Sequence, residues 1–216
     1  MKIIVIGATG MAGSQVAKEA LKRGHTVVAI ARSAEKLKAL FPPQKQLTLL
    51  AKDVFQLTKD DFGTPDVIVD CFATAPEKAY LHVDLAAKLV AMYRETEKPR
   101  LIFILGAGSL QTGRDLHLFV EDLRKMLGTS PVVQVPENQL KELKFLENVD
   151  DVNWVGISPS ADFHAGPATA YLLGSDELLK NAEGKSETTS GTMAQVILNE
   201  IEDPQHHQER FTVCDK

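Results

Sequence analysis

Three glycines near the start of the chain are spaced for binding phosphates. Gly7, Gly10 and Gly13 follow directly after the apolar run IIVI at 3–6. In a strand–loop–helix unit the first glycine permits a tight turn and the second lets the backbone approach a pyrophosphate. The third lets the helix pack closely on the strand. The alternative is a glycine-rich turn without a ligand, but the position between a strand and a helix favours a dinucleotide. A P-loop is excluded, because no Gly-Lys-Ser/Thr sequence follows.

The end of the next apolar run, TVVAI at 26–30, indicates which dinucleotide binds. An acidic residue at this point would bind the ribose 2′-hydroxyl of NAD(H). The chain instead has Arg32 and Ser33, with no carboxylate before Glu35. A guanidinium forms charge-assisted hydrogen bonds with phosphate, so we expect NADP(H) to be preferred over NAD(H). The alternative is a solvated arginine at a helix start, a position that the helix dipole disfavours.

Short β-branched runs alternate with longer helical patterns through the first half of the chain. The runs are continuously apolar, which is typical of a parallel sheet that is buried on both faces. We therefore predict an α/β protein with a doubly wound parallel sheet (a Rossmann fold) and helices on both faces. The expected strands are 3–6, 26–30, 46–51, 66–70 and 100–105, and the expected helices are 11–23, 34–40 and 77–97.

The second half is less regular, and no Pro-, Gly- or Ser-rich linker separates it from the first. We therefore predict one domain over residues 1–216, with a small C-terminal elaboration over the sheet edge. The elements expected here are helices at 118–127, 137–148 and 191–201 and strands at 152–158, 171–173 and 210–214.

The composition narrows the function classes. The formal net charge is −5, whereas nucleic-acid-binding domains usually carry a basic face, so no nucleic-acid partner is expected. Cys71 and Cys214 form no CxxC pattern, and His206 and His207 lie near no carboxylate cluster, so neither a disulfide nor a metal site is predicted. No apolar run approaches the roughly eighteen residues of a membrane span. The first run is also too short for a signal peptide, and we expect a cytoplasmic protein.

Several segments together resemble one protein family. They are GATGMAG (7–13), VVAIARS (27–33), KDVF (52–55), LGAGSL (105–110), WVGISPSADFHAGPATAYLLGSDELL (154–179) and QERFTVC (208–214). The chain resembles the atypical short-chain dehydrogenase/reductases that have an NmrA-like or NAD(P)H-binding Rossmann domain. Within that group it is similar to small bacterial proteins proposed to be NADH-flavin reductases and, more distantly, to biliverdin reductase B/flavin reductase. Only about 111–150 lacks a matching motif.

The resemblance implies that the cofactor contacts come from loops at the carboxyl ends of the strands, where ligands bind in open α/β sheets. For Asp53 a simple turn or helix cap is an equal alternative. The implied contacts are Gly7, Thr9, Gly10, Met11, Ala12 and Gly13 at the pyrophosphate, Arg32 and Ser33 at the adenosine phosphate, Asp53 and Val54 at the adenine, Phe72, Ala73 and Thr74 along the path to the nicotinamide, Gly106 and Ala107 below the nicotinamide, and Pro159 and Ser160 over its carboxamide.

The chain departs from this family in its acid–base residues. Short-chain dehydrogenases typically carry a Tyr-x-x-x-Lys pair, but Tyr80, Tyr93 and Tyr171 are followed four residues on by Asp, Glu and Ser. Oxidation of a secondary alcohol is therefore not favoured. The remaining catalytic candidates are Ser109, which could orient a substrate, and His164, which could titrate in the useful range. The alternatives are a turn-capping serine and a plain surface histidine.

These observations predict an NADPH-dependent reductase that passes a hydride to a small ring acceptor such as a flavin or quinone. Such an acceptor can take its proton from water, so the missing Tyr-Lys pair is tolerable. An alternative is an NmrA-like sensor that binds NADP(H) without turnover. A sugar epimerase is a third interpretation, which the absent pair disfavours. The sequence leaves the oligomeric state open.

Overall fold

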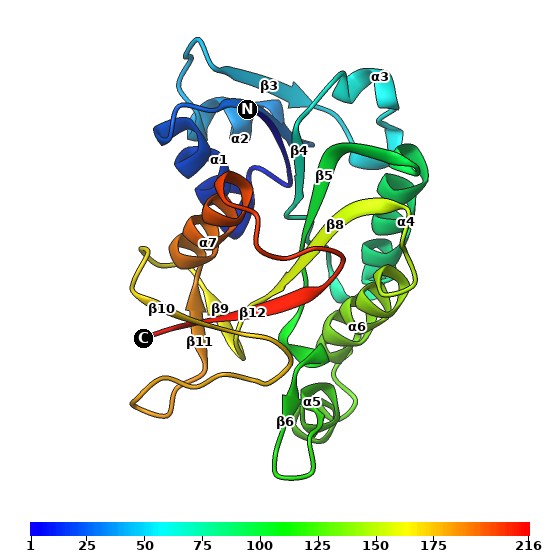
Figure 1. Ribbon diagram of the computed structural model, residues 1–216, viewed down its shortest axis with the longest axis vertical. Coiled ribbons are helices and arrows are strands. Elements are labelled where there is room, and N and C mark those ends of the chain that lie inside the picture. The colour runs from blue at the N-terminus through cyan, green and yellow to red at the C-terminus, as the bar shows by residue number, and fades with distance from the viewer.

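The structure is a computed structural model that describes residues 1–216, and it is built on one sheet of eight strands (Figure 1). Neighbouring strands are parallel except at one edge, where β10 and β12 are antiparallel. In spatial order the strands are β10 (Tyr171–Gly174), β12 (Arg210–Asp215), β8 (Val152–Ser158), β5 (Thr96–Ile104), β4 (Val67–Asp70), β1 (Lys2–Ile6), β2 (Thr26–Ala31) and β3 (Leu47–Ala51).

The β1 strand shows why these strands are apolar throughout. Ile3 and Val5 belong to one core layer and Ile4 and Ile6 to the other, because successive side chains of a strand point to opposite faces. Both faces are therefore covered, and the predicted doubly wound α/β fold is confirmed. The first layer is closed by α1 (Met11–Lys22), α2 (Ala34–Leu40) and α7 (Ser190–Glu202), and the second by α3 (Lys59–Phe62), α4 (Leu81–Tyr93) and α6 (Gln134–Leu146).

The remaining elements are short and lie outside the main sheet. Two small ribbons stand apart from it, one parallel and one antiparallel. None of the helices has both the length and the hydropathy to cross a membrane. These elements are β9 (Asp162–His164) with β11 (Glu187–Thr189), β6 (Gln111–Thr112) with β7 (His117–Leu118), α5 (Phe119–Leu127), and the 3₁₀ turns η1 (Val54–Gln56), η2 (Pro76–Lys78), η3 (Ala107–Ser109) and η4 (Pro131–Val133).

The helix predicted at 77–97 is wrong at both ends. The first residues form the separate turn η2, and α4 ends at Tyr93. Glu95 then adopts a left-handed conformation with φ 58°, and β5 begins at Thr96. A right-handed helix cannot continue through this left-handed residue, and Pro99 keeps the helix from resuming beyond it. The short elements α3, β6, β7, β9 and β11 were not predicted.

The C-terminal strands β10 and β12 extend the main sheet at one edge. The β12 strand pairs in parallel with β8, and β10 pairs with β12. The elaboration is therefore limited to the β9–β11 ribbon and its loops, which lie beside this edge in Figure 1.

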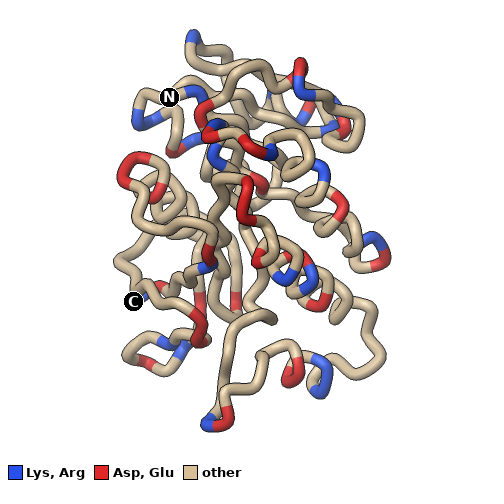
Figure 2. Tube along the Cα trace, turned by 45° about the vertical axis from the view of Figure 1, so that its right-hand side comes forward, with Lys and Arg blue, Asp and Glu red and all other residues tan.

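A buried ion pair joins the sheet to α7. Arg100 of β5 donates to the Glu200 carboxylate at 2.7 Å, and both side chains are buried. The same guanidinium also donates to the Glu200 carbonyl, at 2.8 Å. Most other charges are exposed, and Figure 2 shows both signs interspersed along the chain.

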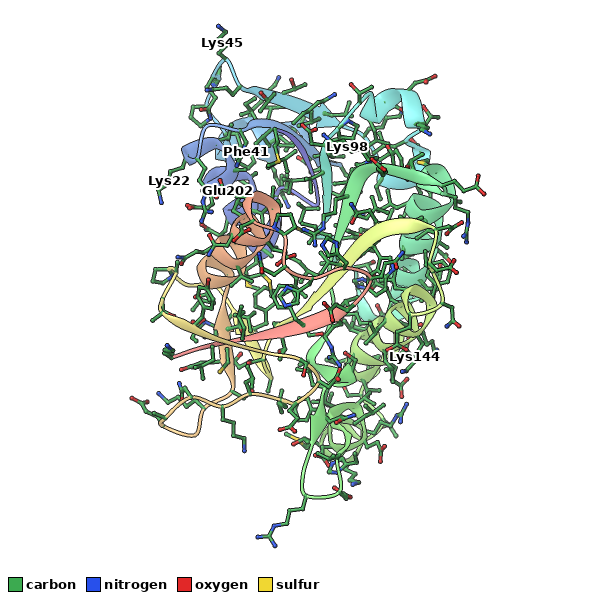
Figure 3. All side chains as sticks on the ribbon, viewed as in Figure 1. Lys22, Phe41, Lys45, Lys98, Lys144 and Glu202 are labelled. Atoms are coloured by element: carbon green, nitrogen blue, oxygen red, sulfur yellow. The ribbon has the colours of Figure 1, made fainter.

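We expect Glu200→Ala to lower the free energy of unfolding by about 3–5 kcal/mol, because it leaves Arg100 buried without its countercharge. Urea denaturation measures this change. Glu202→Ala is the matched control on the same helix (Figure 3), since Glu202 is 38% exposed and its partners, Arg23 and His25, also bind other groups or lie near the surface. Its expected effect is below about 1 kcal/mol. Equal losses in the two variants would contradict the assignment.

Candidate functional site

The glycine loop packs against the end of β4. Gly7 has φ 73°, and a Cβ at this position would lie 2.4 Å from the Cys71 carbonyl oxygen. A Cβ at Gly13 would lie 2.4 Å from the Gly7 carbonyl oxygen. Any larger residue at either place would push the loop from the sheet. Gly10 precedes α1, and no acidic residue occupies the first turn of that helix. The N–H groups of this turn are therefore available to an anion.

A cavity of about 290 Å³ opens beside this loop, at the carboxyl ends of the strands. The structure brings together here nine of the predicted cofactor-binding residues, from four separate loops. They are Gly7, Thr9, Gly10, Arg32, Asp53, Val54, Phe72, Ala73 and Thr74. The sequence did not point to the other lining residues, which are Ile6, Ile30, Ala31, Lys52, Phe55, Cys71, Lys78 and Leu81.

The cations at the rim of this cavity differ in their partners. The Lys52 ammonium contacts both oxygens of Asp61 at 2.9 Å, and this hydrogen bond is the main reason that the pKa of Asp61 falls to about 2. The Arg32 guanidinium is exposed and forms no hydrogen bond or ion pair within the chain. Arg32 is therefore free to bind an anion in the cavity.

Two of the predicted polar contacts cap local helices. The Asp53 carboxylate accepts the Phe55 N–H at 2.9 Å, so the alternative of a cap is observed. The Ser33 hydroxyl accepts the Lys36 N–H at the start of α2 and donates to Glu35. Contacts of Asp53 and Ser33 with a cofactor stay predictions.

The other predicted contacts do not line this cavity. Met11, Ala12 and Gly13 form the first turn of α1. Gly106 and Ala107 follow β5, and Pro159 and Ser160 follow β8. Ser160 is buried, its hydroxyl donates to the Val213 carbonyl and its N–H donates to the Thr188 hydroxyl. These bonds give Ser160 a structural role, and its contact with a nicotinamide stays a prediction.

The two catalytic candidates belong to different elements, Ser109 to η3 and His164 to β9. Ser109 is buried, and its hydroxyl donates to the Gly106 carbonyl at 3.0 Å, as a turn-capping serine does. Arg210 in turn donates to the Ser109 hydroxyl at 3.3 Å. His164 lies in β9 on the C-terminal ribbon, 41% exposed. Neither residue lines the cavity, so their catalytic roles stay predictions.

A buried group of titratable side chains lies behind Phe72, which lines the cavity. The Asp70 carboxylate accepts the Phe72 N–H at 2.8 Å, and burial raises the pKa of Asp70 to about 7. The His82 ring packs edge-on against Phe72, and burial lowers the pKa of His82 to about 4. Glu142 of α6 lies 3.8 Å from His82, and burial raises its pKa well above the usual range.

Burial disfavours the charged form of each of these three groups, and neither carboxyl is paired with a lysine or an arginine. None of them was predicted as a site residue, although the sequence carries a signal for two of them. His82 falls on the apolar face of α4 with Leu85 and Leu89, and Glu142 is followed by Leu143 on α6. A titratable residue on an apolar helix face indicates a buried group with a perturbed pKa.

Comparison with known proteins places the whole chain, not only the glycine loop, among relatives. A sequence model of a family described as NAD(P)H-binding matches residues 7–204. YwnB of Bacillus subtilis is 37% identical over 225 residues, which cover 99% of this chain and 98% of YwnB.

Two solved structures are similar to this chain over nearly the whole length of both proteins. A Lactobacillus casei protein is 37% identical, with a TM-score of 0.93 over 100% of this chain and 99% of that one. A Streptococcus pneumoniae protein, proposed to be an NADH-flavin reductase, is 30% identical, with a TM-score of 0.85 over 100% of both chains.

We expect Asp70→Asn to stabilise the protein above neutral pH. The native pKa of Asp70 lies above its ordinary value of 3.8. The stability that its protonated form contributes is therefore complete below about pH 4 and is lost as the pH rises through about 7. Asparagine stays neutral and keeps an oxygen for the Phe72 N–H. The advantage of the variant in free energy of unfolding should grow from pH 4 to pH 8 by up to about 4 kcal/mol.

Urea denaturation at several pH values measures this difference. Asp66→Asn is the control of opposite sign, because the hydrogen bond from Lys98 lowers the pKa of Asp66. At neutral pH the free energy of unfolding of Asp66→Asn should be lower than that of wild type. The difference should shrink in acid, where Asp66 itself becomes protonated. A pH profile of Asp70→Asn parallel to wild type would show that Asp70 ionises normally.

Proposed function

The chain belongs to the NAD(P)H-binding family, and on this premise we propose that it is an NADPH-dependent reductase whose acceptor is a flavin or quinone-like ring. The family membership and the Streptococcus pneumoniae relative support an oxidoreductase role. The preference for NADPH and the class of acceptor are our further proposals, and they rest on the cavity and on the missing acid–base pair.

The residues around the cavity fit a dinucleotide. Gly7 lets the loop pack on the end of β4 and Gly13 lets α1 pack on the loop, and the first turn of α1 supplies free N–H donors beside them. Phe72 and Val54 provide apolar walls on which a flat ring can rest. The glycine loop would hold the pyrophosphate, and Asp53, Val54 and Phe72 would surround the adenine end.

The single observation that carries the preference for NADPH is the free guanidinium of Arg32 in the same cavity as the glycine loop. The β2 strand ends at Ala31 without the carboxylate that would bind a ribose 2′-hydroxyl. Arg32 would bind a 2′-phosphate through two parallel charge-assisted hydrogen bonds. Lys52 is held by Asp61 and would add to the positive potential from a fixed position.

The proposed class of acceptor follows from the absence of a tyrosine–lysine pair in this chain. A bound reduced nicotinamide supplies a hydride, which an electron-poor ring accepts together with a proton from water. The chain therefore needs to orient two rings and does not need a tyrosine–lysine pair. Ser109 and Arg210 would act by fixing the η3 turn, on which the nicotinamide is predicted to rest.

One observation favours a sensor without turnover as the second candidate. Both catalytic candidates of the sequence lie outside the cavity, and the Ser109 hydroxyl is already engaged within the chain. A protein that only senses whether NADP(H) is oxidised or reduced would need the cavity but no catalytic group beside it.

Titration with NADPH and NADH, followed by nicotinamide fluorescence, tests the first step of the proposal. We expect NADPH to bind more tightly than NADH. Addition of FMN or a simple quinone should then produce a loss of nicotinamide absorbance that depends on the acceptor and on the protein. Tight binding without turnover across several flavins and quinones would favour the sensor, and absence of binding would contradict both functions.

Arg32→Glu tests the phosphate contact separately. We expect the affinity for NADPH to fall by about tenfold or more, the effect of losing one hydrogen bond to a charged group. The affinity for NADH should hold or rise. Lys38→Glu on α2 makes the same change of charge outside the cavity, and it should leave both affinities near wild type. An unchanged NADPH affinity in Arg32→Glu would show that Arg32 does not bind the 2′-phosphate.

A further inference from the structure

We propose that Asp162, His164 and Glu187 bind a divalent transition-metal ion such as Zn²⁺ on the β9–β11 ribbon. None of these residues lines the dinucleotide cavity, and binding of a metal here does not depend on the function proposed above. The sequence predicted no metal site, because Glu187 lies far along the chain from the other two. Three features of the ribbon support a metal site: the register of its strands, the identity of its donor atoms and the absence of other partners for its two carboxylates.

The register of the ribbon places the three side chains on one face. Asp162 is the direct neighbour of Glu187, and His164 lies two residues further along β9. Phe163, between them, points the other way and packs against the core, as the alternation of a strand requires. The ligand atoms of the three residues all lie within 4.8 Å of one another. Metal–ligand bonds of about 2.0–2.2 Å can span such a group after small side-chain rotations.

The histidine presents the correct nitrogen for a metal. Its Nδ1 lies 3.1 Å from the Ala165 carbonyl oxygen, which can only accept, so Nδ1 carries the hydrogen. The Nε2 atom therefore has the free lone pair, and it faces the Glu187 carboxylate at 4.0 Å. A hydrogen bond from the far nitrogen to a carbonyl is the usual way in which proteins orient a metal-binding imidazole.

The two carboxylates have no counter-ion within the chain. Neither the Asp162 nor the Glu187 side chain accepts a hydrogen bond, and 4.0 Å is too long for one from His164. Lys185 is near enough for Glu187 to raise its pKa, but its ammonium pairs with Glu183 at 2.9 Å. Two carboxylates would balance a divalent charge, and an imidazole with two carboxylates is a donor set that suits Zn²⁺ and its neighbours.

The backbone that carries these residues is held in place. The Asp162 N–H donates to the Ser186 carbonyl at 2.9 Å. Further along β11, Thr188 donates its hydroxyl to the Val213 carbonyl at 2.8 Å, and the Thr189 N–H donates to Asp215. The ribbon is thereby fixed to β12, so little order must be created when a metal binds.

A second histidine, His117, also lies beside two carboxylates, but here both ring nitrogens are hydrogen-bonded to them. His117 binds Asp115 through one ring nitrogen at 2.7 Å and Asp122 through the other at 2.9 Å. Both nitrogens are engaged, and the hydrogen bond to Asp115, followed by that to Asp122, raises the pKa of His117. The carboxylates of that group already occupy both ring nitrogens, and His117 serves as the matched control.

Isothermal titration of the untagged, chelator-treated full-length protein with Zn²⁺ tests the proposal, with the visible spectrum of bound Co²⁺ as a second readout. We expect saturable binding of one ion. His164→Gln and Glu187→Gln should each weaken it by more than about tenfold, a loss that even an outer partner of a metal site can cause. His117→Gln should bind as wild type does. Circular dichroism confirms that each variant is folded.

Three results would overturn the proposal: no saturable binding in wild type, unchanged binding in both His164→Gln and Glu187→Gln, or loss of binding in His117→Gln instead. The titration is made without NADPH or acceptor. A failure here is therefore distinguishable from a failure of the reductase proposal.

Discussion

The contact between Gly7 and the Cys71 carbonyl fixes how two neighbouring strands end. Because a Cβ cannot fit there, the β1 loop lies directly on the β4 end, and α1 starts beside the sheet with its first N–H groups exposed. The same approach sets the position of Phe72, which forms the cavity wall on one side and covers Asp70 and His82 on the other. The loop thus organises both the phosphate-binding end and the buried group behind it.

Charge is distributed unevenly about this point. Cations lie at the rim of the cavity, where water and a ligand can reach them, and burial raises the pKa of both Asp70 and Glu142 behind it. Ionised carboxylates in the same place would oppose the phosphates of a dinucleotide at short range and in a poorly screened environment. Burial therefore reduces the negative charge behind the cavity, although Asp53 lines the cavity and the chain as a whole is acidic.

The sequence predicted those parts of the structure that depend on local pattern. The continuous apolar strands and the glycine spacing specified the sheet, and residues that directly follow β1, β2 and β4 came together in the cavity as expected. The sequence did not predict Lys52 or the group formed by Asp70, His82 and Glu142, because tertiary packing alone joins residues so far apart. The predicted helix at 77–97 also ran through Glu95, where a left-handed residue reverses the chain.

The buried carboxyls also change the number of protons that the folded protein binds. The formal net charge of −5 counts every carboxylate as ionised. Burial raises the pKa of Glu142 well above its usual range and the pKa of Asp70 to about 7, so near neutral pH the folded chain binds more protons at these two groups than the unfolded chain does. Unfolding near neutral pH therefore releases protons from these groups into the buffer. The measured heat of unfolding then includes the ionisation heat of whichever buffer takes those protons up.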